Sequence, residues 1–293
     1  MYDYKLLEAL AMVVRHGGFE RAARAMFLTQ SAVSQRIKQL EEELGQTLVV
    51  RTVPPRATAA GRALLRHVQQ VQLLEQALAD ELVPAGTHGP ARLPIAVNAD
   101  SLATWLIDAL APLLEADRMR FELRVLDEER THELLRDGEV VGCVSARSRP
   151  VQGCRMTAIG RIRYRLCATE DFRDRWLPEG LTAEAVARAP LVAFHRDDVL
   201  HRTLLGELLD EVPPTRPHFV PSFEQGCTLV RRGMAFGMLA DAQGERLRAS
   251  GELVDLAPGH VVDVPLYWHC WNVRSPLLGE LTEALTAREL QGA

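Results

Sequence analysis

A short run of amide, hydroxyl and ammonium side chains near the N-terminus has the spacing of one helical face. Most of these residues recur at intervals of three or four, and no carboxylate interrupts them before Glu41. Such side chains can pair with the donors and acceptors that base edges present in the major groove of DNA. Any one of them alone would also fit a solvated helix surface, but the group favours a DNA-reading face. Its members are Gln30, Ser31, Ser34, Gln35 and Lys38.

The opposite face of the same segment is apolar and requires a core. Val33, Ile37, Leu40 and Leu44 form this stripe, and Gly45 ends the predicted helix. Two earlier helices are expected over residues 6–14 and 19–26, with a tight turn at 27–29 in which Thr29 caps the third helix. Helix, short turn and helix is the layout of a helix-turn-helix.

A basic connection follows the predicted reading helix. Short strands are expected at 48–50 and 57–58, and the segment between them begins with Arg51, ends with Arg56 and is stiffened by two prolines. We interpret it as a wing in which Arg51 and Arg56, together with Arg36, contact phosphate and set affinity rather than sequence preference.

Residues 59–83 predict one long helix, because they contain no Pro and a single Gly. Leu64, Val68, Val71, Leu78 and Leu82 give it a heptad-like seam, which favours a dimerising linker helix. Packing of this seam on its own domain is the alternative. The Pro- and Gly-rich stretch 84–90 then reads as a joint.

Strand and helix patterns alternate after the joint, which predicts α/β architecture with mainly parallel sheets. Strands are expected at 93–97, 121–126, 140–144, 191–194, 219–220 and 236–239, and helices at 101–114, 131–137, 201–209, 223–232 and 242–249. The irregular middle favours two lobes, joined by crossing segments at 160–164 and 267–270, with a final helix at 277–290 returning to the first lobe.

Polar residues that follow these strands are the candidates for a ligand site, because ligands of open α/β sheets bind beyond the carboxyl ends of strands. Acids outnumber bases among them, which favours a cationic ligand. The carboxylate of an amino acid would fit the helix starts at Ser101 or Thr131, with Arg130 assisting. Each residue would equally fit a helix cap. The candidates are Asn98, Asp100, Ser101, Asp127, Glu128, Arg130, Thr131, Ser145, His195, Asp197, Asp198, Ser222, Glu224 and Asp241.

Composition and charge narrow the class of protein. The net charge is −5, yet residues 1–61 hold eight Lys and Arg against six Asp and Glu, so a basic head precedes an acidic body. Five scattered cysteines without a CxxC pair fit reduced thiols in the cytoplasm. No membrane span, signal peptide, nucleophile elbow, phosphate loop or zinc motif is visible, so we expect no membrane association, no cofactor, no metal and no enzyme. His195 and His201 are interpreted as surface residues and Cys143 as a core thiol.

The first 61 residues resemble the LysR-type transcriptional regulators. The resemblance implies an N-terminal winged helix-turn-helix at 1–58, a dimerisation linker helix and hinge at 59–90, and a two-lobed effector domain of periplasmic-binding-protein type at 91–293. Lobe I would comprise about 91–162 and 268–293, and lobe II about 163–267. Val49 departs from the aromatic residue usual in the family. The motif is carried by residues 19–23, 30–41, Gly45, Leu48, Arg51 and 58–61.

A narrower likeness, to the ArgP-type branch, rests on residues 51–56, 96–105 and 266–269. Members of that branch respond to lysine and arginine, so the likeness implies one of these as effector. It also implies operator DNA, a homodimer or tetramer, and RNA polymerase as partners. An architectural DNA-binding protein without an effector, an α/β enzyme and an exported solute-binding protein are the alternatives; the DNA head opposes the last.

Overall fold

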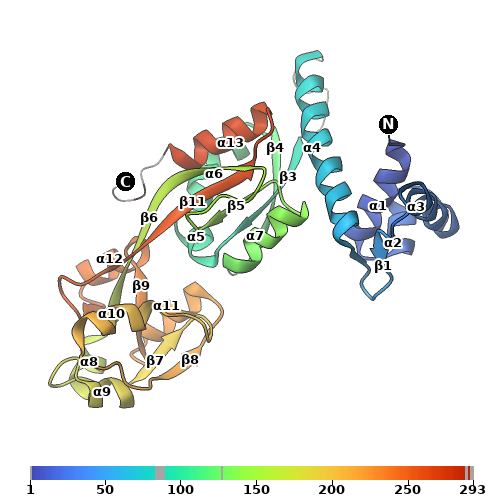
Figure 1. The fold of residues 1–293 in the computed structure, drawn as a ribbon. Coiled ribbons are helices and arrows are strands. Elements are labelled where there is room, and N and C mark those ends of the chain that lie inside the picture. Colours follow the sequence, from blue (N-terminus) through green and yellow to red (C-terminus); the bar gives the residue numbers. More distant parts are fainter. Residues whose placement is uncertain (1, 83–89, 127, 288–289, 291–293) are drawn as a thin grey trace.

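The computed structural model describes residues 2–82, 90–126, 128–287 and 290, apart from the side chains of 80–81 and 128–130. A helical head, one long helix and two α/β lobes follow one another along the molecule (Figure 1). No helix in these described ranges is both long and apolar enough to cross a membrane.

The head confirms the predicted winged helix-turn-helix. Three helices enclose an apolar core that includes Leu10, Val33, Ile37 and Leu40, all at most 1% exposed. Thr29 caps the third helix, because its side chain accepts a hydrogen bond from the Ala32 backbone N–H. The elements are α1 (Tyr4–His16), α2 (Phe19–Ala25), α3 (Gln30–Leu44) and an antiparallel pair, β1 (Val49–Val50) and β2 (Arg56–Ala57).

The apolar side chains of the long helix α4 (Ala59–Leu82) lie in three different environments. Leu64 and Val68 are buried in the core of the head. The first half of the predicted seam therefore packs within its own chain, which was the alternative to dimerisation. Leu73 is buried in the core of lobe I. Leu78 and Leu82, farther along the helix, are 53% and 73% exposed in this single chain.

Lobe I surrounds a parallel three-stranded sheet in the order β4-β3-β5. The single helix expected at 101–114 is wrong: the helix breaks at Trp105, whose backbone leaves helical geometry (φ −124°) while its indole is 4% exposed in the core. The elements are β3 (Ala91–Val97), α5 (Ala99–Thr104), α6 (Leu106–Glu115), β4 (Met119–Val125), α7 (Glu128–Asp137), β5 (Gly142–Ser145) and α13 (Pro276–Thr286).

Lobe II has its own parallel sheet, in the order β9-β7-β8, with helices packed around it. Its elements are α8 (Glu170–Trp176), α9 (Ala183–Arg188), β7 (Pro190–Ala193), α10 (Leu200–Leu208), β8 (Arg216–Phe219), α11 (Phe223–Arg231), β9 (Phe236–Ala240), α12 (Asp241–Ala249) and the short β10 (Val254–Asp255).

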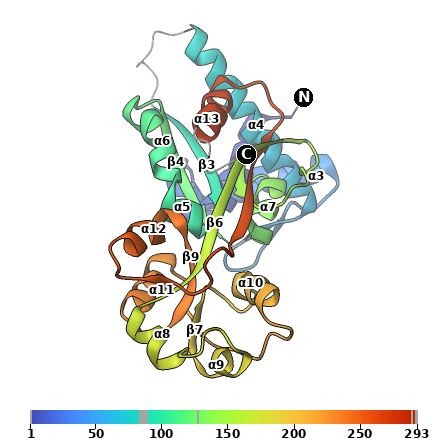
Figure 2. The same cartoon turned by 90° about the vertical axis from the view of Figure 1, so that its left-hand side faces the viewer.

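Two long strands, β6 (Cys154–Ala168) and β11 (Val262–Trp271), join the lobes into one nine-stranded sheet. They pair antiparallel with each other and with their neighbours β9 and β5, so the sheet is parallel only within each lobe, which corrects the mainly parallel expectation. Figure 2 shows β6 passing continuously from one lobe to the other. The predicted crossings at 160–164 and 267–270 lie inside these strands.

Candidate DNA-reading face and ligand pocket

The predicted reading face lies on the outer side of α3. Gln30, Ser31, Gln35 and Lys38 are exposed, whereas Ser34 is partly buried. Lys38 Nζ lies 3.4 Å from a Glu42 carboxylate oxygen one turn later, a surface contact that a nucleic acid could displace. The two Gln side chains of this face are therefore exposed on the surface, and the Ser31 hydroxyl lies 3.0 Å from the Thr29 hydroxyl.

The wing is fastened to the end of α3 by Glu41. One carboxylate oxygen of Glu41 accepts the backbone N–H groups of Leu48, at 2.7 Å, and of Val49, at 3.3 Å. In the sequence Glu41 marks only the limit of the predicted reading face, and nothing near it predicts this second role. Gly61 adds a steric requirement, because a Cβ there would lie 2.2 Å from the carbonyl oxygen of Leu48.

The basic residues of the wing lie beside this anchor. Arg51 is exposed and its guanidinium carbon lies 5.3 Å from the centre of the Phe19 ring, a contact that helps to position the side chain. Arg56 is exposed on β2, and Arg36 on α3 is partly buried. These positions suit phosphate contacts beside the reading face.

A pocket opens between the lobes, bordered by α5 of lobe I and by α10 and α11 of lobe II. Asp100 enters it from α5 and accepts a hydrogen bond from the Tyr164 hydroxyl on β6. Phe223 packs edge-on against Tyr164, with ring centres 6.5 Å apart. Ser222 lies beside Phe223 as the N-cap of α11.

Lobe II supplies a second carboxylate. Asp198 accepts the backbone N–H groups of Phe194, at 3.0 Å, and of Leu200, at 3.1 Å, so the loop before α10 holds it in place. His201 lines the same pocket and is 5% exposed, which shows that the interpretation of this residue as a surface histidine is wrong. Burial lowers the pKa of His201, and the negative charge of Asp198 partly opposes that effect.

Among the candidates whose side chains the structure describes, the others do not line this pocket. Ser145 and Thr131 are fully buried within lobe I, while His195, Asp197 and Glu224 are exposed. Asp127 and the side chains of Glu128 and Arg130 lie outside the described residues.

Three other candidates have specific surroundings. Asp241 is bound by Arg165, at 3.0 Å, and by Arg248, so its charge is compensated within lobe II. Asn98 and Ser101 lie at the start of α5, and Asn98 Oδ1 and Ser101 Oγ are buried without a hydrogen-bond partner.

Sequence reasoning did not assign the aromatic walls of the pocket. Tyr164 lay inside a predicted crossing segment, but nothing in its surroundings in the sequence indicated that it binds Asp100. Phe194 and Phe223 fall at the ends of a predicted strand and a predicted helix. Cys143, by contrast, is fully buried as expected, and burial raises its pKa far above the ordinary range of thiols.

Comparisons with known families cover nearly the whole chain. Residues 4–62 match the family described as "Bacterial regulatory helix-turn-helix protein, lysR family", and residues 87–289 match the "LysR substrate binding domain". The curated "HTH-type transcriptional regulator ArgP" of Pseudomonas aeruginosa is 47% identical over 294 residues, which is 100% of this chain and 97% of that protein. The regulator of the same name in Serratia proteamaculans is 45% identical, with coverages of 97% and 95%.

Solved structures give the same assignment. The crystal structure of ArgP from Mycobacterium tuberculosis aligns with a TM-score of 0.87 at 39% identity, covering 98% of this chain and 97% of that one. Full-length LysG from Corynebacterium glutamicum with bound effector Arg aligns with a TM-score of 0.78 at 33% identity, with the same coverages. The predicted likeness to the ArgP-type branch is confirmed, as is the expectation of a regulator rather than an enzyme. The chain belongs to the LysR family of DNA-binding transcriptional regulators.

Proposed function

We propose that a basic amino acid, arginine or lysine, binds in the pocket between the lobes and thereby controls operator binding. The observation that carries this proposal is the charge of the pocket: Asp100 and Asp198 enter it, and the described residues that line it include no Lys or Arg. Carboxylates that enter a cleft between low-dielectric walls attract a cationic ligand.

The shape of the wall supports the same ligand class. The rings of Phe194 and Phe223 offer an apolar bed for the methylene stem of a basic side chain, and they can face its cationic end. The Gln225 N–H donates to Ser222 Oγ at the start of α11, and the positive end of this helix could receive an α-carboxylate. The arginine named as effector in the LysG structure makes arginine the first ligand to test.

Calorimetry on the full chain tests the proposal, with arginine, lysine, glutamine and glutamate as ligands. Asp100→Asn should raise the dissociation constant for the basic ligands about tenfold or more, because a charge-assisted contact is lost. Glu224→Gln is the matched control, since Glu224 is exposed outside the pocket. Equal binding of glutamine and arginine would refute the charge argument, and no binding at all would favour an architectural DNA-binding protein.

For DNA, we propose that Gln30, Ser31, Ser34, Gln35 and Lys38 read base edges while Arg36, Arg51 and Arg56 hold phosphate. Gln35→Ala should weaken binding to operator DNA more than binding to random DNA in gel-shift titrations. Equal losses on both would overturn the assignment of Gln35.

We further propose that α4 pairs two chains, because its apolar side chains beyond Leu73 are exposed in this single chain. Such a dimer would place two heads on successive half-sites of the operator. Assembly of dimers into a tetramer, contact with RNA polymerase and action in the cytoplasm extend this proposal.

A further inference from the structure

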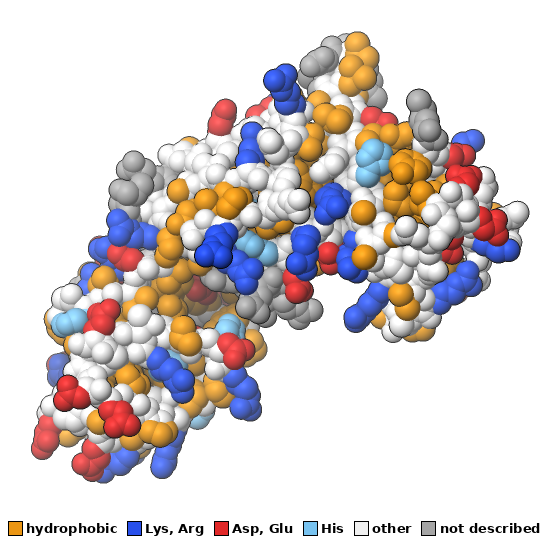
Figure 3. Space-filling model, in the orientation of Figure 1, with side chains coloured by type: hydrophobic (Ala, Val, Ile, Leu, Met, Phe, Trp, Pro, Cys, Tyr) orange, Lys and Arg blue, Asp and Glu red, His pale blue; other side chains and the backbone are white. Residues whose placement is uncertain are grey.

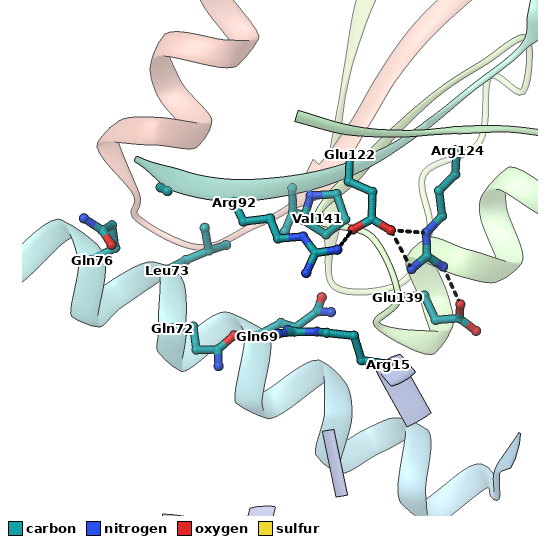
Figure 4. A pocket seen from close by; sticks show the side chains of 12 residues that line it. Arg15, Gln69, Gln72, Leu73, Gln76, Arg92, Glu122, Arg124, Glu139 and Val141 are labelled. Atoms are coloured by element: carbon teal, nitrogen blue, oxygen red, sulfur yellow. Dashed lines mark hydrogen bonds and ion pairs between the residues drawn. The ribbon is translucent and has the colours of Figure 1, made fainter. Parts of the chain in front are cut away.

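A second pocket lies where the head and α4 meet lobe I, on the other side of that lobe from the pocket between the lobes. Its volume is about 180 Å³, and α1, α4, β3 and β4 all contribute to its wall. Figure 4 shows Arg15 reaching along α4 toward Gln69, with Arg92 of β3 on the opposite side. Pro94 and Val141 form an apolar floor.

The charges of this pocket do not balance. On the side of lobe I, Glu122 contacts both Arg92 and Arg124, and Arg124 also contacts Glu139 at 2.6 Å. Arg15 arrives from α1 as a third guanidinium, and within the described ranges no carboxylate forms an ion pair with it. Burial, followed by the nearby charge of Arg92, lowers the pKa of Arg15, so its positive charge is only partly compensated by Glu122.

One acceptor in the wall also lacks a donor. Gln69 Oε1 is buried without a hydrogen-bond partner, on the part of α4 that Arg15 approaches. Burying a hydrogen-bond acceptor without a donor costs free energy, so a ligand that donates an O–H or N–H to Gln69 Oε1 would be favoured. The guanidinium group of Arg15, which has no carboxylate ion-pair partner among the described residues, favours a ligand with negatively charged oxygens.

We propose that this pocket is a ligand site for a small tetrahedral oxyanion that retains a proton, such as hydrogen phosphate. Its charged oxygens accept from Arg15 and Arg92, and its O–H donates to Gln69. Sulfate has a similar shape but carries no O–H at neutral pH, so it satisfies the arginines and leaves Gln69 unpaired. This site needs neither the pocket between the lobes nor an amino acid.

Such a ligand would join the head to lobe I. The helix α4, whose first half packs in the core of the head, already contacts lobe I through an Arg62–Asp137 ion pair at 3.0 Å and a hydrogen bond of 2.7 Å from Arg66 to the Arg136 carbonyl oxygen. Lys and Arg side chains gather at this junction on the molecular surface (Figure 3). Because an anion held by both parts favours their docked arrangement, its binding would be coupled to any motion of the head upon DNA.

Calorimetry on the full chain without DNA tests the proposal, with inorganic phosphate and sulfate at constant ionic strength. The intact chain should bind phosphate several-fold more tightly than sulfate. Arg15→Gln should raise the phosphate dissociation constant about tenfold or more, and Arg15→Lys should restore part of the affinity, since it keeps the charge but not the fork. Gln69→Leu should keep anion binding and abolish the preference for phosphate.

Lys5→Gln is the control, because it removes one positive charge from α1 at an exposed position outside the pocket; it should leave phosphate affinity unchanged. The site is refuted if Arg15→Gln, shown by circular dichroism to be folded, binds phosphate like the intact chain, or if the intact chain binds no phosphate. Equal affinity for sulfate and phosphate in the intact chain would overturn the role of Gln69 and the requirement for a proton.

Discussion

Acidification should weaken lobe I through a buried histidine, His132. His132 lies on α7, is 7% exposed, and packs edge-on against the fully buried His269 with ring centres 4.5 Å apart. Its Nε2 has no hydrogen-bond partner. Burial first, and then the charges of His269 and Arg147, lower its pKa from 6.5 to about 4.

The sign and size of the effect follow from proton linkage. Below pH 6.5 the unfolded chain binds a proton at His132 while the folded chain does not, so stability falls as the pH falls from 6.5 toward 4. At pH 5 the difference amounts to about 2 kcal/mol, at about 1.4 kcal/mol per pH unit. The pKa of His269 is lowered as well, chiefly by burial, and adds a loss of the same sign.

Urea unfolding at pH 7 and pH 5, followed by tryptophan fluorescence, measures this loss. Trp105, Trp268 and Trp271 are all buried in the core of lobe I and report mainly on that lobe. His132→Phe keeps a ring and removes the titrating nitrogens, so the variant should lose about 2 kcal/mol less than the intact chain between the two pH values. His218→Gln, at an exposed position of lobe II, is the control. Equal losses in the intact chain and His132→Phe would refute the reasoning.

Three further outcomes are expected. Gly61→Ala forces a Cβ to within 2.2 Å of the Leu48 carbonyl oxygen. It should destabilise the head by about 1–3 kcal/mol in thermal unfolding and weaken DNA binding. An unchanged melting temperature would contradict the steric requirement for glycine at this position. Gly279→Ala in α13 meets no atom within 4 Å and should instead stabilise the chain by about 1 kcal/mol, which makes it the matched control. Leu78→Glu replaces an exposed apolar residue of α4 with a charge and should lower the mass observed in sedimentation equilibrium at low concentration; an unchanged mass would exclude α4 pairing at this position.

The head and α4 could be predicted from the sequence because their signals are local. The apolar stripe through Val33 and Ile37, the Thr29 cap and the stop at Gly45 each depend on residues within a few positions. The wing anchor could not be predicted in the same way. Glu41 binds backbone N–H groups seven and eight residues later, and this depends on how the chain turns in space.

The length of β6 was missed although its pattern is regular. Arg161, Arg163 and Arg165 alternate with apolar residues, which is the period of a strand. Arg163 is satisfied by Asp263 on the neighbouring strand, at 2.8 Å, and such partners far along the chain are not visible to local reasoning. Because these arginines made the segment look polar, the sequence did not predict the full strand that runs from one lobe to the other.

The pocket between the lobes was only partly predictable for a related reason. The rule that ligands bind beyond strand ends selected Asp100, Asp198 and Ser222, all of which line it. The same rule selected Asp241, whose carboxylate is instead held by Arg165 and Arg248. The end of a strand fixes where a residue's backbone lies. Which charged side chains meet there depends on how helices from distant parts of the chain pack.

The pairing of β6 with β11 has a mechanical consequence. The lobes are joined by a hydrogen-bonded ribbon instead of flexible loops, so any relative movement must bend or twist paired strands. The ladder is irregular between Leu266 and Tyr267, opposite Gly160, so we expect the twist to concentrate at this interruption of the pairing. We therefore expect lobe closure to be a small elastic twist, with a restoring force that opens the cleft once the ligand leaves.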